Sequence, residues 1–91
     1  GYFSLPILQR GALVGRIDAK MHRKEKVLEL KSCHQEKGVR FTEKKRAELK
    51  AAITLFAAWQ QATEVKIQYQ PDDWRYFWGD GWLLDGVSTQ A

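Results

Sequence analysis

The segment from Leu13 to His22 alternates between apolar and charged side chains with the period of two that is typical of a β-strand. One side carries the apolar residues Leu13, Ile17, Ala19 and Met21. The other side carries Arg16, Asp18, Lys20 and His22, and Val14 is the one apolar residue that falls on this side. An extended chain would turn the first set toward a core and hold the second set in one row at the surface. Because three of the four side chains in that row are potential cations, the row is basic.

The chain before this segment predicts a hairpin partner for it. Residues 2–8 predict a first strand, in which Pro6 favours an edge strand or the outer side of a strand because proline has no backbone N–H. Gly11 permits the turn that leads into the second strand, residues 12–22. Gly15, inside the second strand, indicates a bulge or the close approach of another backbone or of a ligand.

The charged residues 23–26 predict a second turn, and residues 27–36 predict a third strand. Its alternation places Leu28, Leu30, Ser32 and His34 on one side and Glu29, Lys31, Cys33 and Gln35 on the other. His34 is therefore expected at a hydrogen-bonded edge of the core. Glu29 could pair across the hairpin with Arg16 or Lys20, an exposed contact that contributes about 0.2–1 kcal/mol and offsets part of the basic row.

A helix is predicted to begin after Thr42, whose hydroxyl suits an N-cap, with Glu43 near the positive end of the helix dipole. Apolar residues at spacings of three and four predict a stripe that lies on the sheet, made of Leu49, Ala52, Ile53, Phe56 and Trp59. The residues expected to face away are Lys44, Lys45, Lys50 and Thr54.

Residues 64–70 alternate again and predict a fourth strand, with Val65, Ile67 and Tyr69 inward and Lys66, Gln68 and Gln70 outward. The order βββαβ predicts an α+β fold, a small antiparallel β-sheet with one packed helix, over residues 1–70. Residues 71–91 form a tail rich in tryptophan that follows no period. The sequence leaves its fold open between a flap over the core, a surface for another part of the protein and an unnatural end of a reading frame.

Composition restricts the function classes. A net charge of +4 favours an anionic partner, although a mild excess of charge also serves solubility. The single cysteine, Cys33, excludes an internal disulfide, and with no secretory signal a cytoplasmic protein is expected. The longest apolar run, residues 51–59, is too short for a membrane span. A start at Gly1 without methionine leads us to expect a piece of a longer protein.

The residue types needed for catalysis or metal binding do not occur in suitable patterns. Cys33 and His34 are adjacent on a strand and must point to opposite faces, and His22 is distant, so neither a metal nor a cofactor is expected. Asp18 lies between Arg16 and Lys20, which favours an ion pair over a catalytic base. The chain itself is therefore expected to be a binding or support module rather than a catalytic one.

The basic row and the turn after it are the candidate binding site. Six potential cations fall within eleven residues, and they are Arg16, Lys20, His22, Arg23, Lys24 and Lys26. Such a cluster predicts contacts with the phosphates of a nucleic acid. The alternative is an ordinary solvated strand face, which is the more common meaning of a charge run.

Three segments between residue 3 and about residue 67 carry a recognisable pattern. They are Leu5-Pro6-Ile7-Leu8, then Leu13-Val14-Gly15-Arg16-Ile17-Asp18-Ala19-Lys20 with Arg23, and then Val27-Leu28-Glu29-Leu30 with His34. In these segments the chain resembles the C-terminal part of the YcaQ/AlkZ family of winged-helix DNA glycosylases. The resemblance implies an accessory domain of a DNA-repair enzyme whose tandem winged helices hydrolyse the N-glycosidic bond of alkylated or crosslinked purines. The catalytic glutamine motif of that family belongs to the upstream part, so no catalytic residue is carried over, and Gln68-Tyr69-Gln70 matches its spacing by coincidence.

Two functions follow as hypotheses. In the first, Arg16, Lys20 and Arg23 hold the phosphate backbone of double-stranded DNA without reading its sequence while the winged-helix domains do the chemistry. In the second, the domain is purely structural, its charges tie the sheet or an interdomain surface together, and its aromatic residues dock on the upstream helices. A small standalone nucleic-acid binder is a third possibility.

Overall fold

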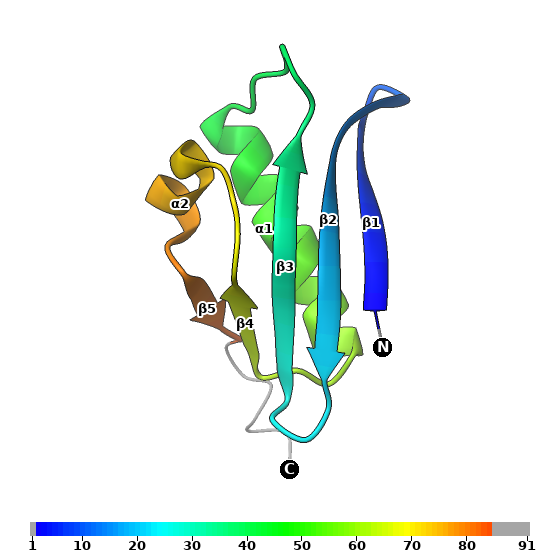
Figure 1. The fold of residues 1–91 in the computed structure, drawn as a ribbon, viewed down its shortest axis with the longest axis vertical. Coiled ribbons are helices and arrows are strands. Elements are labelled where there is room, and N and C mark those ends of the chain that lie inside the picture. The colour runs from blue at the N-terminus through cyan, green and yellow to red at the C-terminus, as the bar shows by residue number, and fades with distance from the viewer. Residues whose placement is uncertain (1, 85–91) are drawn as a thin grey trace.

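Three antiparallel strands form the first part of the sheet in the computed structural model, which describes residues 2–84 (Figure 1). They are β1 (Tyr2–Gln9), β2 (Ala12–His22) and β3 (Val27–Gln35). β1 is an edge strand, as the proline at position 6 predicted. The bounds of all three strands agree with the alternation in the sequence to within one residue.

A helix and a second group of elements complete the fold. α1 (Glu43–Trp59) connects β3 to β4 (Glu64–Ile67), which pairs parallel to β3, and α2 (Asp72–Trp78) leads to β5 (Gly81–Leu83), antiparallel to β4. The sheet order is β1-β2-β3-β4-β5. The α+β class and the order βββαβ are confirmed, with one more helix and one more strand after them.

The predicted N-cap of α1 is present. The Thr42 side-chain oxygen accepts a hydrogen bond from the backbone N–H of Lys45 at 3.1 Å, and Glu43 occupies the acidic position of the first turn. The hydrogen bond to Thr42 satisfies one of the unpaired N–H groups at this end of the helix, and the Glu43 carboxylate lies near the positive end of the helix dipole.

A β-bulge at Lys31 changes which side of β3 faces the core. Ala19 pairs with Leu30 but Asp18 pairs with Ser32, so one extra residue lies in β3 between the two pairs. Beyond the bulge the alternation is inverted, and Cys33 is fully buried while His34 is exposed. The prediction that His34 forms an edge of the core is wrong for this reason. His34 instead lies 3.3 Å from the Glu36 carboxylate at the surface.

A second irregularity occurs near the tip of the first hairpin. The pairing of β1 with β2 shifts between Ile7 and Leu8, and as a result Val14 is buried while Leu13 is 54% exposed, contrary to the predicted alternation. The prediction for Gly15 is confirmed, because a Cβ atom there would lie 2.6 Å from the carbonyl oxygen of His34 in β3. Only glycine lets the two backbones approach this closely.

The face of α1 that contacts the rest of the protein is rotated from the predicted stripe. Ile53 is buried as expected, but Trp59 is 78% exposed. Thr54, predicted to face away, accepts a hydrogen bond from the indole N–H of Trp82 at 2.9 Å, and the Lys50 ammonium lies 5.0 Å from the centre of the same indole ring. The contacting face of α1 therefore extends toward Trp82 of β5.

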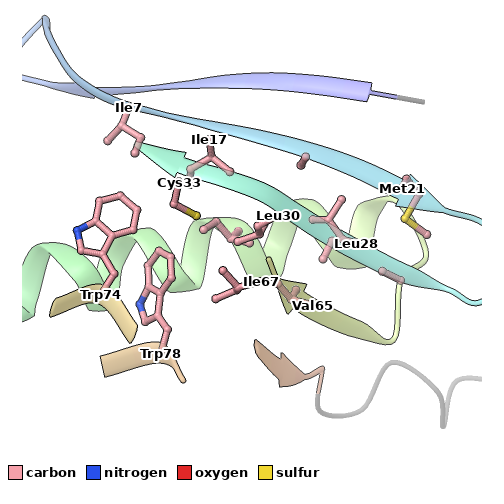
Figure 2. Packing of buried hydrophobic residues seen from close by; sticks show 14 of the residues in the cluster. Ile7, Ile17, Met21, Leu28, Leu30, Cys33, Val65, Ile67, Trp74 and Trp78 are labelled. Atoms are coloured by element: carbon pink, nitrogen blue, oxygen red, sulfur yellow. The ribbon is translucent and has the colours of Figure 1, made fainter. Parts of the chain in front are cut away.

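Residues 71–84 of the aromatic tail belong to the core rather than to a separate unit. Trp74 and Trp78 of α2 are buried (Figure 2). The Trp74 ring stacks on Phe41 with 5.3 Å between centroids. The Trp74 indole N–H also donates to the Gln35 side-chain oxygen at 2.7 Å, which joins α2 to the end of β3. The rest of the predicted tail, residues 85–91, lies outside the described residues.

The last part of the predicted fourth strand is not a strand. β4 ends at Ile67, after which Tyr69 is 64% exposed and Gln70 is 4% exposed, the reverse of their predicted sides. The Gln70 amide donates to the carbonyl oxygen of Gly79 at 2.6 Å, so it turns under α2. The chain leaves the alternation here because it bends into the helix that follows.

We expect Trp74→Ala to lower the free energy of unfolding by about 3–5 kcal/mol, because it removes a fully buried ring and its hydrogen bond to Gln35. Urea denaturation would measure the change. The matched control is Tyr76→Ala in the same helix, where the side chain is 94% exposed and the change should stay within about 0.5 kcal/mol. Equal effects of the two substitutions would contradict the placement of α2 in the core.

Candidate nucleic-acid interface

The sheet has one face covered by α1, and its other face carries the charged row of β2. α1 lies behind the strands in Figure 1, and the core side chains lie between it and the sheet (Figure 2). Ile17, Ala19 and Met21 of β2 are buried on that side. The alternating residues of β2 therefore reach the opposite face, which no helix among residues 2–84 covers.

Arg16 forms the ion pair with Asp18 that the sequence predicted. The guanidinium Nε lies 3.6 Å from the Asp18 carboxylate, and the two side chains are 56% and 42% exposed. An ion pair this exposed contributes little to stability, but it offsets the charge that Arg16 presents to a partner.

Lys20 lies between an aromatic ring and an acid. Its ammonium is 5.0 Å from the centre of the Tyr2 ring, which belongs to the directly opposed residue on β1. On the other side Glu29 of β3 opposes it in register, but the predicted ion pair of Glu29 with Arg16 or Lys20 is not formed, because the Glu29 carboxylate binds His22. Because the Tyr2 ring carries no net charge, this contact does not offset the positive charge of Lys20.

His22 is the residue that binds Glu29. Its Nε2 and the Glu29 carboxylate oxygen are 2.7 Å apart, and both side chains are partly buried. Asp18 and Glu29 together therefore offset part of the positive charge of the row, as expected for an exposed sheet face with mixed charge.

The positive charge of the turn after β2 is offset by acidic residues less than the positive charge of the row on β2. Arg23, Lys24 and Lys26 are exposed, and none forms an ion pair with another residue of the 2–84 segment. Arg23 donates instead to the neutral side chain of Gln60 at 3.3 Å. The one acid in the turn is Glu25, so three cations stand against one carboxylate.

This turn is held in place by the loop that follows α1. The carbonyl oxygen of Lys26 accepts a hydrogen bond from the backbone N–H of Thr63 at 2.8 Å, and the Thr63 hydroxyl lies 3.3 Å from the same oxygen. Lys26 has a positive φ of 58°, which lets the turn close. The cations of the turn thus project from an anchored backbone.

The six predicted residues follow a line rather than converging on a point. Arg16 and Arg23 are separated by seven residues, which corresponds to about 24 Å of extended strand. Arg16 lies near the middle of β2, and the turn follows the end of that strand. Such a line suits an extended polyanion better than a small anion.

The structure adds Lys66 of β4 to this face. Lys66 is the register neighbour of Glu29, and it helps to line a shallow hollow whose residues are His22, Glu25, Val27, Glu29, Lys66, Ile67 and Gln68. The alternation predicted that Lys66 points outward, but it did not identify the neighbouring strand. That neighbour follows from the parallel crossover through α1.

Cys33 is unsuited to catalysis. Its burial, and to a lesser extent the negative charge of Asp18, raises the pKa of the Cys33 thiol from 9.0 to about 12. The nucleophilic thiolate is therefore scarce at neutral pH. Within residues 2–84, no three side chains of the metal-binding types come together as a possible metal site.

Comparison with known proteins identifies no family: the chain matches no protein-family model and no solved structure. Neither α1 nor α2 has the length and apolar character needed to cross a membrane.

The buried thiol predicts a pH dependence of stability. Because the pKa of Cys33 is higher in the folded state, the folded protein holds the proton more tightly, and stability falls as the pH rises from 9 to about 12. The slope should approach 1.4 kcal/mol per pH unit, about the value for one proton. The measurement is the difference in unfolding free energy between the wild type and Cys33→Ala across this range, since that difference cancels the lysines and tyrosines. A difference that stays constant with pH would contradict the burial of the thiol.

Proposed function

We propose that this chain is the C-terminal accessory domain of a DNA-repair glycosylase and that it contacts the phosphates of double-stranded DNA. The observation that carries the proposal is the anchored turn after β2, from which Arg23, Lys24 and Lys26 project without acidic partners among residues 2–84. The glycosylase assignment rests on the resemblance of residues 3–67. In this proposal the winged-helix domains of a cytoplasmic parent enzyme hydrolyse the N-glycosidic bond, and this domain helps to hold the duplex.

The chemistry of the turn supports recognition of phosphates rather than of bases. Lysine and arginine side chains of an exposed turn reach backbone oxygens without entering a groove, and such contacts carry little sequence information. The row on β2 continues the contact weakly, because Asp18 and Glu29 offset part of its charge. Most of the affinity is therefore assigned to the turn, with Arg16, Lys20 and His22 as secondary contacts.

Replacing the three cations of the turn by glutamine should weaken duplex binding and flatten its salt dependence. The plot of log affinity against log salt should lose about 2 to 3 of its slope, since each lost phosphate contact removes about 0.9. Fluorescence anisotropy with a labelled duplex, at several salt concentrations, measures both quantities.

The matched control replaces Lys37, Arg40 and Lys44 by glutamine. These residues are exposed and carry the same total charge, but they belong to the segment 37–44, which follows the opposite end of β3 and includes the start of α1 (Figure 1). The control should keep most of the affinity. If both triple variants lose affinity and slope equally, the attraction comes from net charge alone and the proposed site is wrong.

Asp18→Asn should tighten duplex binding about two- to fivefold at low salt, because it releases Arg16 from its carboxylate partner. Asp80→Asn is the control, since it makes the same charge change at an exposed ion pair with Arg75, away from the row. The same titration measures both variants. Weaker binding by Asp18→Asn would argue that Arg16 needs Asp18 to hold its position.

A second candidate function is an interdomain packing module without nucleic-acid contact. The observation that favours it is the pair Leu8 and Leu13, which oppose each other at the tip of the first hairpin and are 55% and 54% exposed. Two adjacent exposed leucines suit an apolar contact with another domain. In this case the triple glutamine variant of the turn would leave duplex affinity of the whole protein unchanged, whereas Leu8→Ser with Leu13→Ser would loosen the domain from its neighbour.

A further inference from the structure

Exposed aromatic rings lie at the same end of the molecule as the cationic turn. The N-terminal end of β1, the C-terminal end of β2 and the last turn of α1 meet there (Figure 1). Tyr2 is 71% exposed and Trp59 is 78% exposed. Neither large ring is used by the core or by the phosphate contacts proposed above.

Trp59 continues a line of aromatic contacts from β1, and each of the two exposed rings has a cation nearby. Phe3 meets Phe56 edge to face with 5.1 Å between centroids, and Phe56 is 6.4 Å from Trp59, so a line of rings runs from β1 to the end of α1. The Lys20 ammonium lies over the Tyr2 ring at 5.0 Å. Arg23 donates to Gln60, the residue that follows Trp59.

We propose that this end of the domain binds unpaired nucleotides of DNA, with a base stacked on Trp59 and the adjoining phosphate held by Arg23. The inference rests on the proposed function and specifies the form of DNA that it prefers. Tyr2 offers a second ring, on the open face of the sheet opposite Lys20. Glu29 and Glu25 are the acids nearest to this end on β3 and in the turn, and His22 occupies the carboxylate of Glu29.

The combination of rings and cations argues for a nucleic acid rather than an apolar protein surface. A site for single-stranded DNA needs positive charge along the backbone and aromatic faces on which bases stack. An apolar docking site would instead exclude charge from its centre. Here Lys20 lies over one ring, and Arg23 is bonded beside the other.

Stacking explains why the bases must be unpaired. Inside an intact duplex both faces of a base are covered by its neighbours, so an exposed indole gains nothing from it. A frayed end, a gap or an extruded nucleotide exposes one face of a base. Because that base is already unstacked, binding it requires no further free energy of unstacking. Since every base has such a face, the preference should be for unpaired structure and not for sequence.

The test compares a labelled oligothymidylate with its blunt duplex, each titrated with the full chain and followed by fluorescence anisotropy. Trp59→Ala should weaken binding of the single strand about 5- to 100-fold, the effect of losing one stacked base, and change duplex binding less than about twofold. Trp59→Phe should retain most of the affinity, because it keeps a ring at the position.

Leu55→Ala is the matched control. Leu55 lies one turn earlier on α1 and is 74% exposed, so its removal takes away a similar apolar surface without an aromatic face. It should leave both affinities unchanged. Both positions are exposed, and thermal melting of each variant checks that the fold is intact.

The outcomes separate this inference from the function on which it rests. If Trp59→Ala leaves single-strand binding unchanged, or if Leu55→Ala weakens it equally, the inference is overturned. The same result together with weakened duplex binding in the triple glutamine variant leaves the proposed function standing. If Trp59→Ala and Leu55→Ala instead alter the sedimentation of the protein without DNA, the patch is an interface between copies of the chain, which also overturns the inference.

Discussion

The core lies on one face of the sheet, between the strands and α1, and the placement of every charged residue discussed above depends on this. Ile17, Leu28, Leu30 and Val65 are buried there, together with the two tryptophans of α2 (Figure 2). In a strand whose apolar residues face the core, the intervening residues must face solvent. The two-layer arrangement therefore leaves the charged row of β2 on an open surface, where burial does not force its cations to be neutralised.

The positive charge of this surface is graded along β2. In the middle of the strand, Arg16 is paired with Asp18, and further on His22 is paired with Glu29. Beyond His22 the turn has one acid against three cations. The gradient concentrates attraction for a polyanion at one end of the sheet, and the hydrogen bond from Thr63 to Lys26 fixes the backbone from which the cations project. The proposed stacking on Trp59 uses the same end, so phosphates and bases would be held by adjacent side chains.

The aromatic residues after β4 divide into two roles that their sequence spacing does not distinguish. Trp74 and Trp78 are buried and extend the core beyond the sheet, while Tyr76, between them, is 94% exposed. Trp82 fills the space beside α1 and engages Lys50 and Thr54. In a chain this short, such large rings compensate for the small number of strands, because each buries about 150–250 Å². The stability of the sheet that carries the candidate interface thus depends partly on residues at the far end of the sequence.

The sequence by itself determined the strands β1 to β3, the start of α1, the edge position of β1 and the close approach at Gly15, because alternation, capping and backbone sterics are local properties. It also determined that Arg16, Lys20 and His22 face outward. The predicted orientations of His34, Leu13 and Tyr69 are wrong, because a bulge, a register shift and the end of a strand interrupt the alternation at these residues. Such interruptions depend on how a strand pairs with its neighbours. Only the tertiary structure decided that residues 71–84 close the core, that Lys66 joins the charged face and that Trp59 stands exposed beside Arg23. Each of these three features depends on which elements pack together after the parallel crossover. That packing brings together residues that are far apart along the chain, so a local sequence pattern cannot predict it.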